Sequence, residues 1–406
     1  MKASPRSLGF DAARLSRVDD FLADKYLSPG KLPCAMTLIA RGGEIAHWGV
    51  QGFGDIERKE KLAEDTVFRI YSMTKPVTSV ALMMLVEEGK IALDDPVHRH
   101  IPAWRDLGVY KAGFIGTFQS ARTTRPMLVV DLLRHTSGLT YGFQNRTNVD
   151  AAYRKRGVGT LPSRGTLEEM ITTLSDMPLE FSPGEAWNYS VSTDICGYLV
   201  EKLSGKPLGQ FFKERIFTPL AMTDTGFEVT PAGGDRFASC YAIKPDGTGI
   251  MKIDDARNST YLAAPTFVSG GGGLVSTASD YLRFCRMMLN GGELDGQRLL
   301  GRKTVELMTM NHLPGGRFLS AMSQSLFSEA SYDGIGFGLG FAVTTDPARA
   351  LIPGSVGEYS WGGAASTYFW IDPKEDLITI FMTQFMPSTL YPLRRELRTA
   401  VYSALI

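Results

Sequence analysis

The sequence lacks an excess of charge of either sign: of its 406 residues, 43 are Lys or Arg and 43 are Asp or Glu. A chain with no net charge offers no electrostatic reason to bind nucleic acid or an anionic membrane surface. The sequence also lacks any apolar run of roughly 18 residues or more, and its start, MKASPRSLGFDAARLSRVDDF, contains no apolar segment of signal-peptide length. These absences favour a soluble cytoplasmic protein with neither nucleic acid nor a membrane as its partner.

Cysteine and histidine are both scarce. The four cysteines lie far apart and form no C-x-x-C pair, so we expect reduced, mostly buried thiols rather than a disulfide framework. Among the five histidines there is no H-E-x-x-H motif, and no carboxylate or cysteine cluster accompanies His98 and His100. The sequence therefore predicts no metal site and no cofactor.

Strand signals occur near both ends of the chain, and helical signals dominate its middle. Two hairpins are predicted, from Ala35–Ala40 with Glu44–Gly49 and from Ser366–Ile371 with Leu377–Met382, and Gly334–Thr345 adds a further strand signal. The spacing of apolar residues predicts helices over Asp11–Tyr26, Thr74–Glu88, Val129–His135, Thr166–Asp176, Thr193–Ser204 with Thr193 as N-cap, Gly209–Ile216 and Pro387–Ile406. Because this length exceeds one simple core, we expect a discontinuous sheet domain of residues 1–95 and 221–406 and a helical domain of residues 96–220.

The stretch FRIYSMTKPVTSVALMMLVEEG places Ser72 and Lys75 at the start of a strongly apolar helix that ends near Gly89. A serine hydroxyl is a poor nucleophile until a base takes its proton, and a lysine one helical turn later can be that base if burial lowers its pKa. The alternative is a capping serine beside a solvated lysine, because S-x-x-K recurs by chance and helix starts favour serine.

Two further features carry residue types suited to catalysis. Tyr189 follows a Pro-Gly turn and precedes a helix, where it is either a packing aromatic or a proton carrier made more easily ionised by a nearby ammonium. Trp361-Gly362-Gly363 leads into a strand, where paired glycines allow close backbone approach and free N–H groups that bind an oxyanion; the alternative is a β-bulge.

Together these residues resemble the bacterial carboxylesterases of family VIII, which share the fold of class C β-lactamases and DD-peptidases. The resemblance spans nearly the whole chain and implies an α+β fold in which an antiparallel sheet, flanked by helices and built from both chain ends, carries an inserted helical domain. The matching segments, in order, are Tyr71-Ser72-Met73-Thr74-Lys75, Leu132–Leu139, Tyr189-Ser190, Ser269–Phe284, Phe337–Phe341 and Trp361-Gly362-Gly363.

The resemblance implies a role for each matching position. Ser72 would be the nucleophile that forms an acyl-enzyme, Lys75 and Tyr189 would transfer protons, and the backbone N–H groups of Ser72 and Ala364 would form the oxyanion hole. The substrate would contact Tyr71, Val191, Trp361, Gly362 and Gly363.

Two of these positions depart from the β-lactamases. Val191 replaces the asparagine two residues after the tyrosine, and Trp361 replaces the lysine of Lys-Thr-Gly. Both changes remove a polar anchor for a β-lactam, so the resemblance favours hydrolysis of a neutral, short-chain ester as a small-molecule substrate.

Other functions remain open. A β-lactamase, a DD-peptidase or an acyltransferase would use the same nucleophile, and a non-catalytic binding protein is disfavoured by the complete Ser72, Lys75 and Tyr189 set. A Ser-His-Asp hydrolase would use His135, but no G-x-S-x-G is present and we interpret His135 as structural. Gly270–Gly273 lacks the lysine of a phosphate-binding loop and predicts close backbone approach between domains instead.

The walls of the substrate pocket are the least accessible to sequence reasoning. We expect them to come from the segments Tyr110–Thr124, Tyr141–Val158 and His312–Tyr332. The natural substrate, its acyl chain and the oligomeric state are not predicted.

Overall fold

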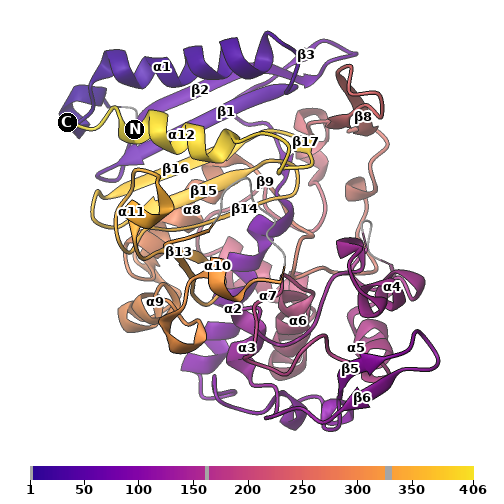
Figure 1. The fold of residues 1–406 in the computed structure, drawn as a ribbon. Coiled ribbons are helices and arrows are strands. Elements are labelled where there is room, and N and C mark those ends of the chain that lie inside the picture. Colours follow the sequence, from indigo (N-terminus) through magenta and orange to yellow (C-terminus); the bar gives the residue numbers. More distant parts are fainter. Residues whose placement is uncertain (1–2, 161–163, 325–331) are drawn as a thin grey trace.

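The computed structural model describes residues 3–160, 164–324 and 332–406. Within these ranges, eight strands form one antiparallel sheet in the order β12-β13-β14-β15-β16-β1-β2-β3 (Figure 1). The strands are β1 (Cys34–Arg41), β2 (Glu44–Asp55), β3 (Glu60–Lys61), β12 (Ile335–Phe337), β13 (Ala342–Thr344), β14 (Tyr359–Gly362), β15 (Tyr368–Asp372) and β16 (Leu377–Met382).

The centre of the sheet joins the two ends of the chain. Strand β1 pairs with β16, so that Leu38 lies opposite Ile380 and Met36 opposite Met382. Both predicted hairpins are present, β1 with β2 and β15 with β16. The predicted α+β fold, with an antiparallel sheet built from both ends, is confirmed.

Helices cover both faces of this sheet. Because side chains alternate across a strand, Ile39 belongs to one core with α1 (Ala12–Leu22) and α12 (Leu393–Tyr402), and its neighbour Leu38 belongs to a second core. Figure 1 shows α1 and α12 side by side over the first face. Helix α8 (Ala278–Leu289) packs against β15 and β16 on the other face.

The second core continues from the sheet into the helical part of the chain. Helix α2 (Thr74–Glu87) is buried on all sides from Thr74 to Leu85 and packs against α6 (Ser192–Ser204). The remaining helices are α3 (Val129–Leu133), α4 (Asn148–Lys155), α5 (Leu167–Ser175), α7 (Leu208–Phe212), α9 (Arg302–Met308), α10 (Leu319–Met322) and α11 (Pro347–Ala350). The predicted boundaries at residues 95 and 220 stay a prediction, because one apolar cluster runs through both parts.

Short strands outside the main sheet complete the fold. They form three antiparallel pairs, β4 (Phe68–Arg69) with β9 (Val275–Ser276), β5 (Val109–Ala112) with β6 (Gln119–Ala121) and β10 (Glu293–Leu294) with β11 (Gln297–Arg298), and one three-stranded sheet of β17 (Phe385–Met386), β7 (Cys240–Ile243) and β8 (Ile250–Asp254). The four cysteines, Cys34, Cys196, Cys240 and Cys285, are buried as expected. In the described residues no helix has both the length and the apolarity to cross a bilayer.

Several predicted boundaries were wrong. Strand β15 begins at Tyr368, because Ser366 has a φ of 66° and lies in the turn from β14. Helix α6 begins at Ser192 with Val191 as its N-cap, so Thr193 is inside the helix. The predicted strand signal at 334–345 is two short strands, β12 and β13, and the C-terminal helix occupies only Leu393–Tyr402 of the predicted range.

Candidate active site

Ser72 lies in a tight turn between strand β4 and helix α2. The 3-10 turn Tyr71–Met73 follows β4 directly, and Tyr71 has a φ of 42°, in the left-handed region that non-glycine residues rarely adopt. The turn is fixed on both sides, since the Ile70 N–H donates to the Leu274 carbonyl and the Met73 N–H donates to the Ile70 carbonyl. The resulting short connection places Ser72 at the wall of a large cavity.

Lys75 is almost fully buried one turn after Ser72. Its Nζ lies 3.2 Å from Ser72 Oγ and 3.0 Å from the Tyr141 hydroxyl, and it donates a 2.6 Å hydrogen bond to the Gly271 carbonyl. Burial lowers the pKa of Lys75 from its ordinary 10.5 to about 7, and the negative charge of Asp194 opposes part of this shift. A buried lysine with this pKa is partly neutral at pH 7, unlike the solvated lysine of the alternative interpretation.

Tyr189 contacts both Ser72 and Lys75. Its hydroxyl donates a 2.5 Å hydrogen bond to Ser72 Oγ, and Lys75 Nζ lies 4.5 Å above its ring centre. In one of the two interpretations drawn from the sequence, a nearby ammonium makes this phenol more easily ionised. Instead burial dominates and raises the pKa of Tyr189, so the phenol keeps its proton at neutral pH.

Three groups that the sequence did not point to complete the surroundings of Lys75. Tyr141 and the Gly271 carbonyl contact its amine directly. Asp194, buried on α6, accepts hydrogen bonds from the Ser269 hydroxyl at 2.6 Å and from the Gly271 N–H at 2.9 Å. The only sequence signal was the Gly270–Gly273 run, whose predicted close approach is present: a Cβ on Gly271 would lie 2.7 Å from an Asp194 carboxylate oxygen.

The Trp361-Gly362-Gly363 segment ends β14 beside the Ser72 turn. A Cβ on Gly363 would lie 2.4 Å from the Ile70 carbonyl oxygen, and one on Gly362 would lie 2.5 Å from the Arg394 guanidinium. The glycines therefore allow the close approach that sequence reasoning expected. Trp361, Gly362, Gly363 and Ala364 line the same cavity as Ser72 and Tyr71.

Val191 is the predicted substrate contact that lies away from this cavity. It has no exposed surface, its N–H donates to the Thr140 carbonyl, and its side chain faces Gly159. Val191, which stands where the β-lactamases have asparagine, therefore lies behind the cavity wall.

His135 is buried beside Tyr189 without reaching Ser72. Its Nδ1 lies 3.2 Å from the Ser190 hydroxyl, and its ring centre lies 5.0 Å from that of Tyr189. Burial lowers the pKa of His135 well below its ordinary value. These contacts suit a histidine that packs against Tyr189.

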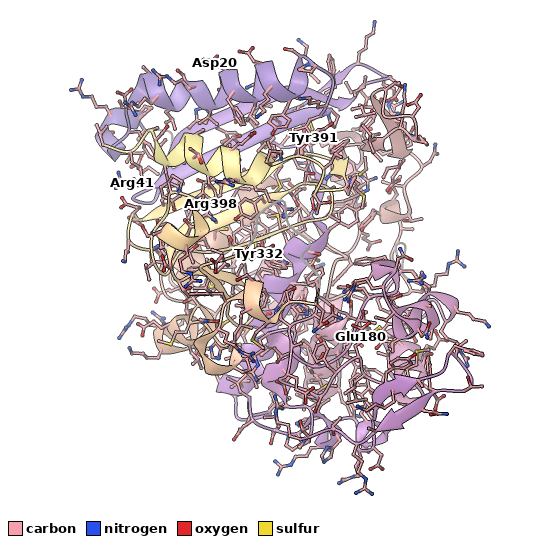
Figure 2. The ribbon with its side chains drawn as sticks, viewed as in Figure 1. Asp20, Arg41, Glu180, Tyr332, Tyr391 and Arg398 are labelled. Carbon is pink, nitrogen blue, oxygen red and sulfur yellow. The ribbon has the colours of Figure 1, made fainter. Side chains whose placement is uncertain are left out.

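The cavity at Ser72 has a volume of about 1260 Å³ and walls from several parts of the chain. Of the predicted wall segments, Tyr141–Val158 contributes Tyr141 and Phe143, whereas no residue of Tyr110–Thr124 lines the cavity. Tyr332 contributes from the third segment and lies between the sheet and the helical part (Figure 2); residues 325–331 of that segment lie outside the described residues. The walls missed from sequence are the segment Ile253–Phe267 and helix α12, which contributes Arg394, Arg395 and Arg398.

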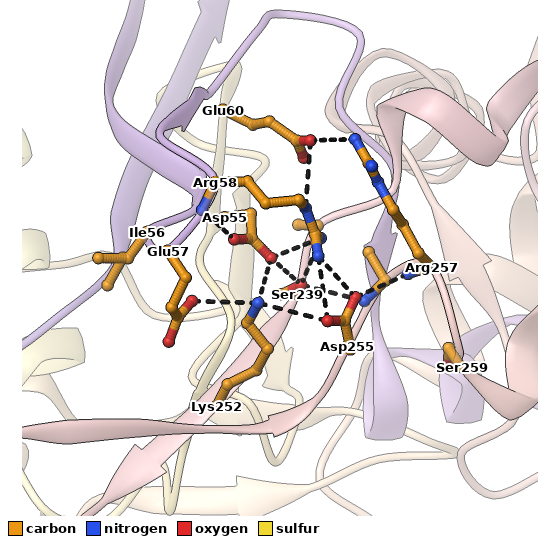
Figure 3. Close-up of polar contacts among 12 residues, drawn as sticks. Asp55, Ile56, Glu57, Arg58, Glu60, Ser239, Lys252, Asp255, Arg257 and Ser259 are labelled. Carbon is orange, nitrogen blue, oxygen red and sulfur yellow. Dashed lines mark hydrogen bonds and ion pairs between the residues drawn. The ribbon is translucent and has the colours of Figure 1, made fainter.

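A network of ion pairs holds the start of the Ile253–Phe267 wall (Figure 3). Arg58 Nη1 contacts the Asp255 carboxylate at 2.9 Å, and Lys252 contacts Asp55 at 2.6 Å. The Arg257 N–H, which donates to the Asp255 carboxylate, lowers the pKa of Asp255 to about 2, and Arg58 and Lys252 add to this effect. The fully buried Arg69, three residues before Ser72, forms an ion pair with Asp254 at 2.7 Å, so this wall is tied to the Ser72 turn.

Comparison with known proteins agrees with this geometry. The family profile described as Beta-lactamase matches residues 20–403. Esterase EstB of Burkholderia gladioli is 30% identical over 425 residues, covering 98% of each chain, and an uncharacterized protein of Mycobacterium tuberculosis is 37% identical over 363 residues, covering 88% of this chain and 87% of its own.

A solved structure extends the likeness to the whole fold. EstCE1, described as a hydrolase with promiscuous acyltransferase activity, is 27% identical and superposes with a TM-score of 0.78 over 98% of this chain and 99% of its own. The family profile, EstB and EstCE1 together confirm the predicted resemblance to family VIII esterases. The chain therefore belongs to the beta-lactamase family, as an esterase-like serine hydrolase.

Proposed function

We propose that this protein hydrolyses short-chain carboxylic esters through an acyl-enzyme on Ser72. The observation that carries the proposal is the pair of contacts to Ser72 Oγ, from the neutral phenol of Tyr189 and from the buried amine of Lys75. A serine hydroxyl between a proton donor and an amine whose pKa is about 7 has both groups that ester cleavage needs at neutral pH.

Lys75 is the base in the first half of the reaction. When neutral, its amine directs its two protons at Tyr141 and the Gly271 carbonyl, which leaves its lone pair for the Ser72 hydroxyl proton. As Lys75 takes this proton, Ser72 Oγ bonds to the ester carbon. The carbonyl oxygen becomes an oxyanion, which the N–H groups of Ser72 and Ala364 stabilise.

Tyr189 assists the departure of the alcohol. When the carbon–oxygen bond to the alcohol breaks, the phenol gives its proton to the leaving oxygen, and the proton on Lys75 restores the neutral pair. Water then attacks the acyl carbon and gives one proton to the same base. The bond between the acyl carbon and Ser72 Oγ then breaks, Lys75 returns its proton to Oγ, and the acid leaves.

Labelling and turnover test this proposal together. A fluorophosphonate should add one adduct to the intact mass of the wild-type protein and none to Ser72→Ala, and p-nitrophenyl esters with acyl chains of two to six carbons should be hydrolysed by the wild type alone. Labelling that persists in Ser72→Ala, or turnover of long-chain triglycerides in preference to short esters, would contradict it. Because EstCE1 is a hydrolase with promiscuous acyltransferase activity, acyl transfer to an added alcohol is the second activity to measure.

A further inference from the structure

A second, smaller cavity opens beside the catalytic one. It has a volume of about 410 Å³ and is lined by residues 154–159, 164 and 165, by one face of α5 and by Phe267. Helices α4 and α5 belong to the helical part of the molecule (Figure 1). Gly159, Met170 and Phe267 line both cavities. The two spaces are therefore adjacent across shared walls.

The lining of this second cavity is strongly basic. Arg154, Lys155, Arg156 and Arg164 all line it, against one acidic residue, Glu169. Arg154 is engaged by Asp150 at 2.7 Å and by the Gly142 carbonyl, and Glu169 caps its own helix through the Thr166 N–H. In the ranges that the structure describes, Lys155, Arg156 and Arg164 form no ion pair, so the cavity carries a local excess of positive charge on a chain with none overall.

Tyr141 lies between Lys75 and Gly159, a residue that lines this cavity. Gly159, with a φ of 58°, packs so closely that an added Cβ would lie 2.9 Å from the Tyr141 ring. The Tyr141 hydroxyl in turn lies 3.0 Å from Lys75 Nζ. The residues that the two cavities share, Gly159, Met170 and Phe267, are therefore the route by which a ligand at Ser72 would approach the basic residues.

The shared walls suit an apolar connecting chain. Met170 and Phe267 are apolar and buried, and Val158 adds a further apolar surface on the basic side. Guanidinium and ammonium groups bind carboxylate and phosphate oxygens through charge-assisted hydrogen bonds. We propose that the basic cavity lined by Lys155, Arg156 and Arg164 binds the anionic end, a carboxylate or a phosphate, of an ester whose carbonyl is attacked by Ser72.

This proposal rests on the proposed esterase function and names its substrate class, and matched substrates test it. One arm compares p-nitrophenyl half-esters of dicarboxylic acids of four to ten carbons with p-nitrophenyl alkanoates of equal length, and so places the anion on the acyl side. The other compares 2-acyloxyethyl phosphate with the 2-methoxyethyl ester, and so places it on the alcohol side. In at least one of the two comparisons, kcat/KM for the anionic ester should exceed that for its neutral match by about tenfold at low salt. This difference should disappear at high salt.

Charge reversal locates the effect. In Lys155→Glu/Arg156→Glu the ratio of anionic to neutral kcat/KM should fall by about tenfold or more, since two attractive contacts become repulsive. The control Lys111→Glu/Arg122→Glu changes charge equally on the exposed β5–β6 hairpin, away from both cavities, and should leave the ratio unchanged. Equal preference for neutral esters in both arms, or an equal loss in both double variants, would overturn the proposal.

A binding measurement separates this proposal from the esterase function. Phenyl phosphate should bind Ser72→Ala protein in ligand-observed NMR, and the added Lys155→Glu/Arg156→Glu changes should abolish that binding. If no ester is turned over but phenyl phosphate binds in this way, the esterase function fails and the basic site stands. If esters are hydrolysed but phenyl phosphate binding is absent or indifferent to charge reversal, the basic site fails alone.

Discussion

The phenol of Tyr189 donates a 2.5 Å hydrogen bond to Ser72 Oγ, while Lys75 Nζ approaches the same oxygen at 3.2 Å. The two contacts differ in kind, because burial raises the pKa of the phenol, which keeps its proton, and lowers the pKa of the amine to about 7, so that it can accept one. A proton donor and a proton acceptor thus face one hydroxyl, which is the arrangement from which the reaction follows.

Replacing Tyr189 by phenylalanine should lower kcat for p-nitrophenyl butyrate by about 100-fold or more, with a smaller change in KM, because the leaving oxygen loses its proton donor. Tyr153→Phe, a change of the same kind on α4, should leave kcat near wild type. Steady-state kinetics on both variants provide the measurement. A Tyr189→Phe enzyme with near-normal kcat would remove Tyr189 from proton transfer.

The burial of the Lys75 amine should make the free energy of unfolding depend on pH. Its pKa is about 7 in the folded chain against an ordinary 10.5, so between these values the unfolded chain holds a proton that the folded chain does not. Stability contributed by this group therefore rises with pH, by at most about 1.4 kcal/mol per pH unit.

Lys75→Met should consequently be more stable than wild type at pH 6, and this advantage should shrink as the pH approaches 9. Urea unfolding at several pH values, followed by circular dichroism, measures the difference in the free energy of unfolding. An advantage that does not change with pH would mean that Lys75 titrates near its ordinary pKa.

Asp194 should act on catalysis through Lys75. For the wild type, kcat/KM should fall as the pH drops below about 7, because Lys75 becomes protonated. Asp194→Asn removes a negative charge that raises the pKa of Lys75 but keeps an acceptor for Ser269 and Gly271. The fall of kcat/KM at acidic pH, the acid limb of the pH profile, should therefore move to lower pH. Asp280→Asn, a buried carboxyl on α8, is the control and should leave the limb in place. An unshifted limb in Asp194→Asn would limit Asp194 to a structural role.

The parts of this site that could be predicted from the sequence are those whose contacts join residues close together in the chain. Ser72 and Lys75 lie within one helical turn, and the glycines of the 361–363 segment signal a close approach whatever their partner, so both were predictable. Tyr141, Asp194 and the Gly271 carbonyl meet at Lys75 only through tertiary packing, and a lone tyrosine or aspartate carries no local signal. The raised pKa of Tyr189 could not be read from the sequence, because it is caused mainly by burial, which depends on the whole fold.

The fold shows the same division. Hairpins and buried helices such as α2 follow from local periodicity, and a sheet built from both chain ends followed from the strand signals at each end and from the family resemblance, whereas the pairing of β1 with β16 was not predicted. The predicted ends of strands and helices were wrong where the conformation of a single residue sets the boundary, as at Ser366 and Val191. The sequence analysis missed the cavity walls from Ile253–Phe267 and α12, because these walls form only when distant segments pack together. Contacts such as the ion pair of Arg69 with Asp254 hold those segments in place.

Gly363→Ala should impair catalysis without touching a proton-transfer group. The new Cβ would lie 2.4 Å from the Ile70 carbonyl oxygen and 2.3 Å from Thr367 Oγ1, so the segment carrying Ala364 must move away from the Ser72 turn. A displacement on the order of 1 Å in an oxyanion hole can lower kcat by about 100-fold. Gly234→Ala, where the added methyl group meets open space, is the matched control. Wild-type kcat in Gly363→Ala would remove this segment from oxyanion binding.

Esters should be far better substrates than β-lactams. At the position where the resembled β-lactamases have lysine, the Trp361 ring packs 5.6 Å from the Tyr189 ring and 5.2 Å from that of Phe337. The Arg394 guanidinium that lies behind this segment is bonded to the Gly363 carbonyl at 2.9 Å and to the Thr367 carbonyl at 3.3 Å. A β-lactam carboxylate beside Trp361 would lose hydration without a matching cation at that position.

As the proposed nucleophile, Ser72 should also react with a strained amide, so a chromogenic cephalosporin should acylate it slowly. We expect kcat/KM for a small p-nitrophenyl ester to exceed that for any β-lactam by about 100-fold, a difference of roughly 2.7 kcal/mol in transition-state stabilisation. Both substrates should be measured on one preparation, with Ser72→Ala as the blank, so that contaminating activity is subtracted from each. Parity between the two would mean that Trp361 does not exclude the carboxylate and that another group, with Arg394 the first to test by Arg394→Gln, binds it.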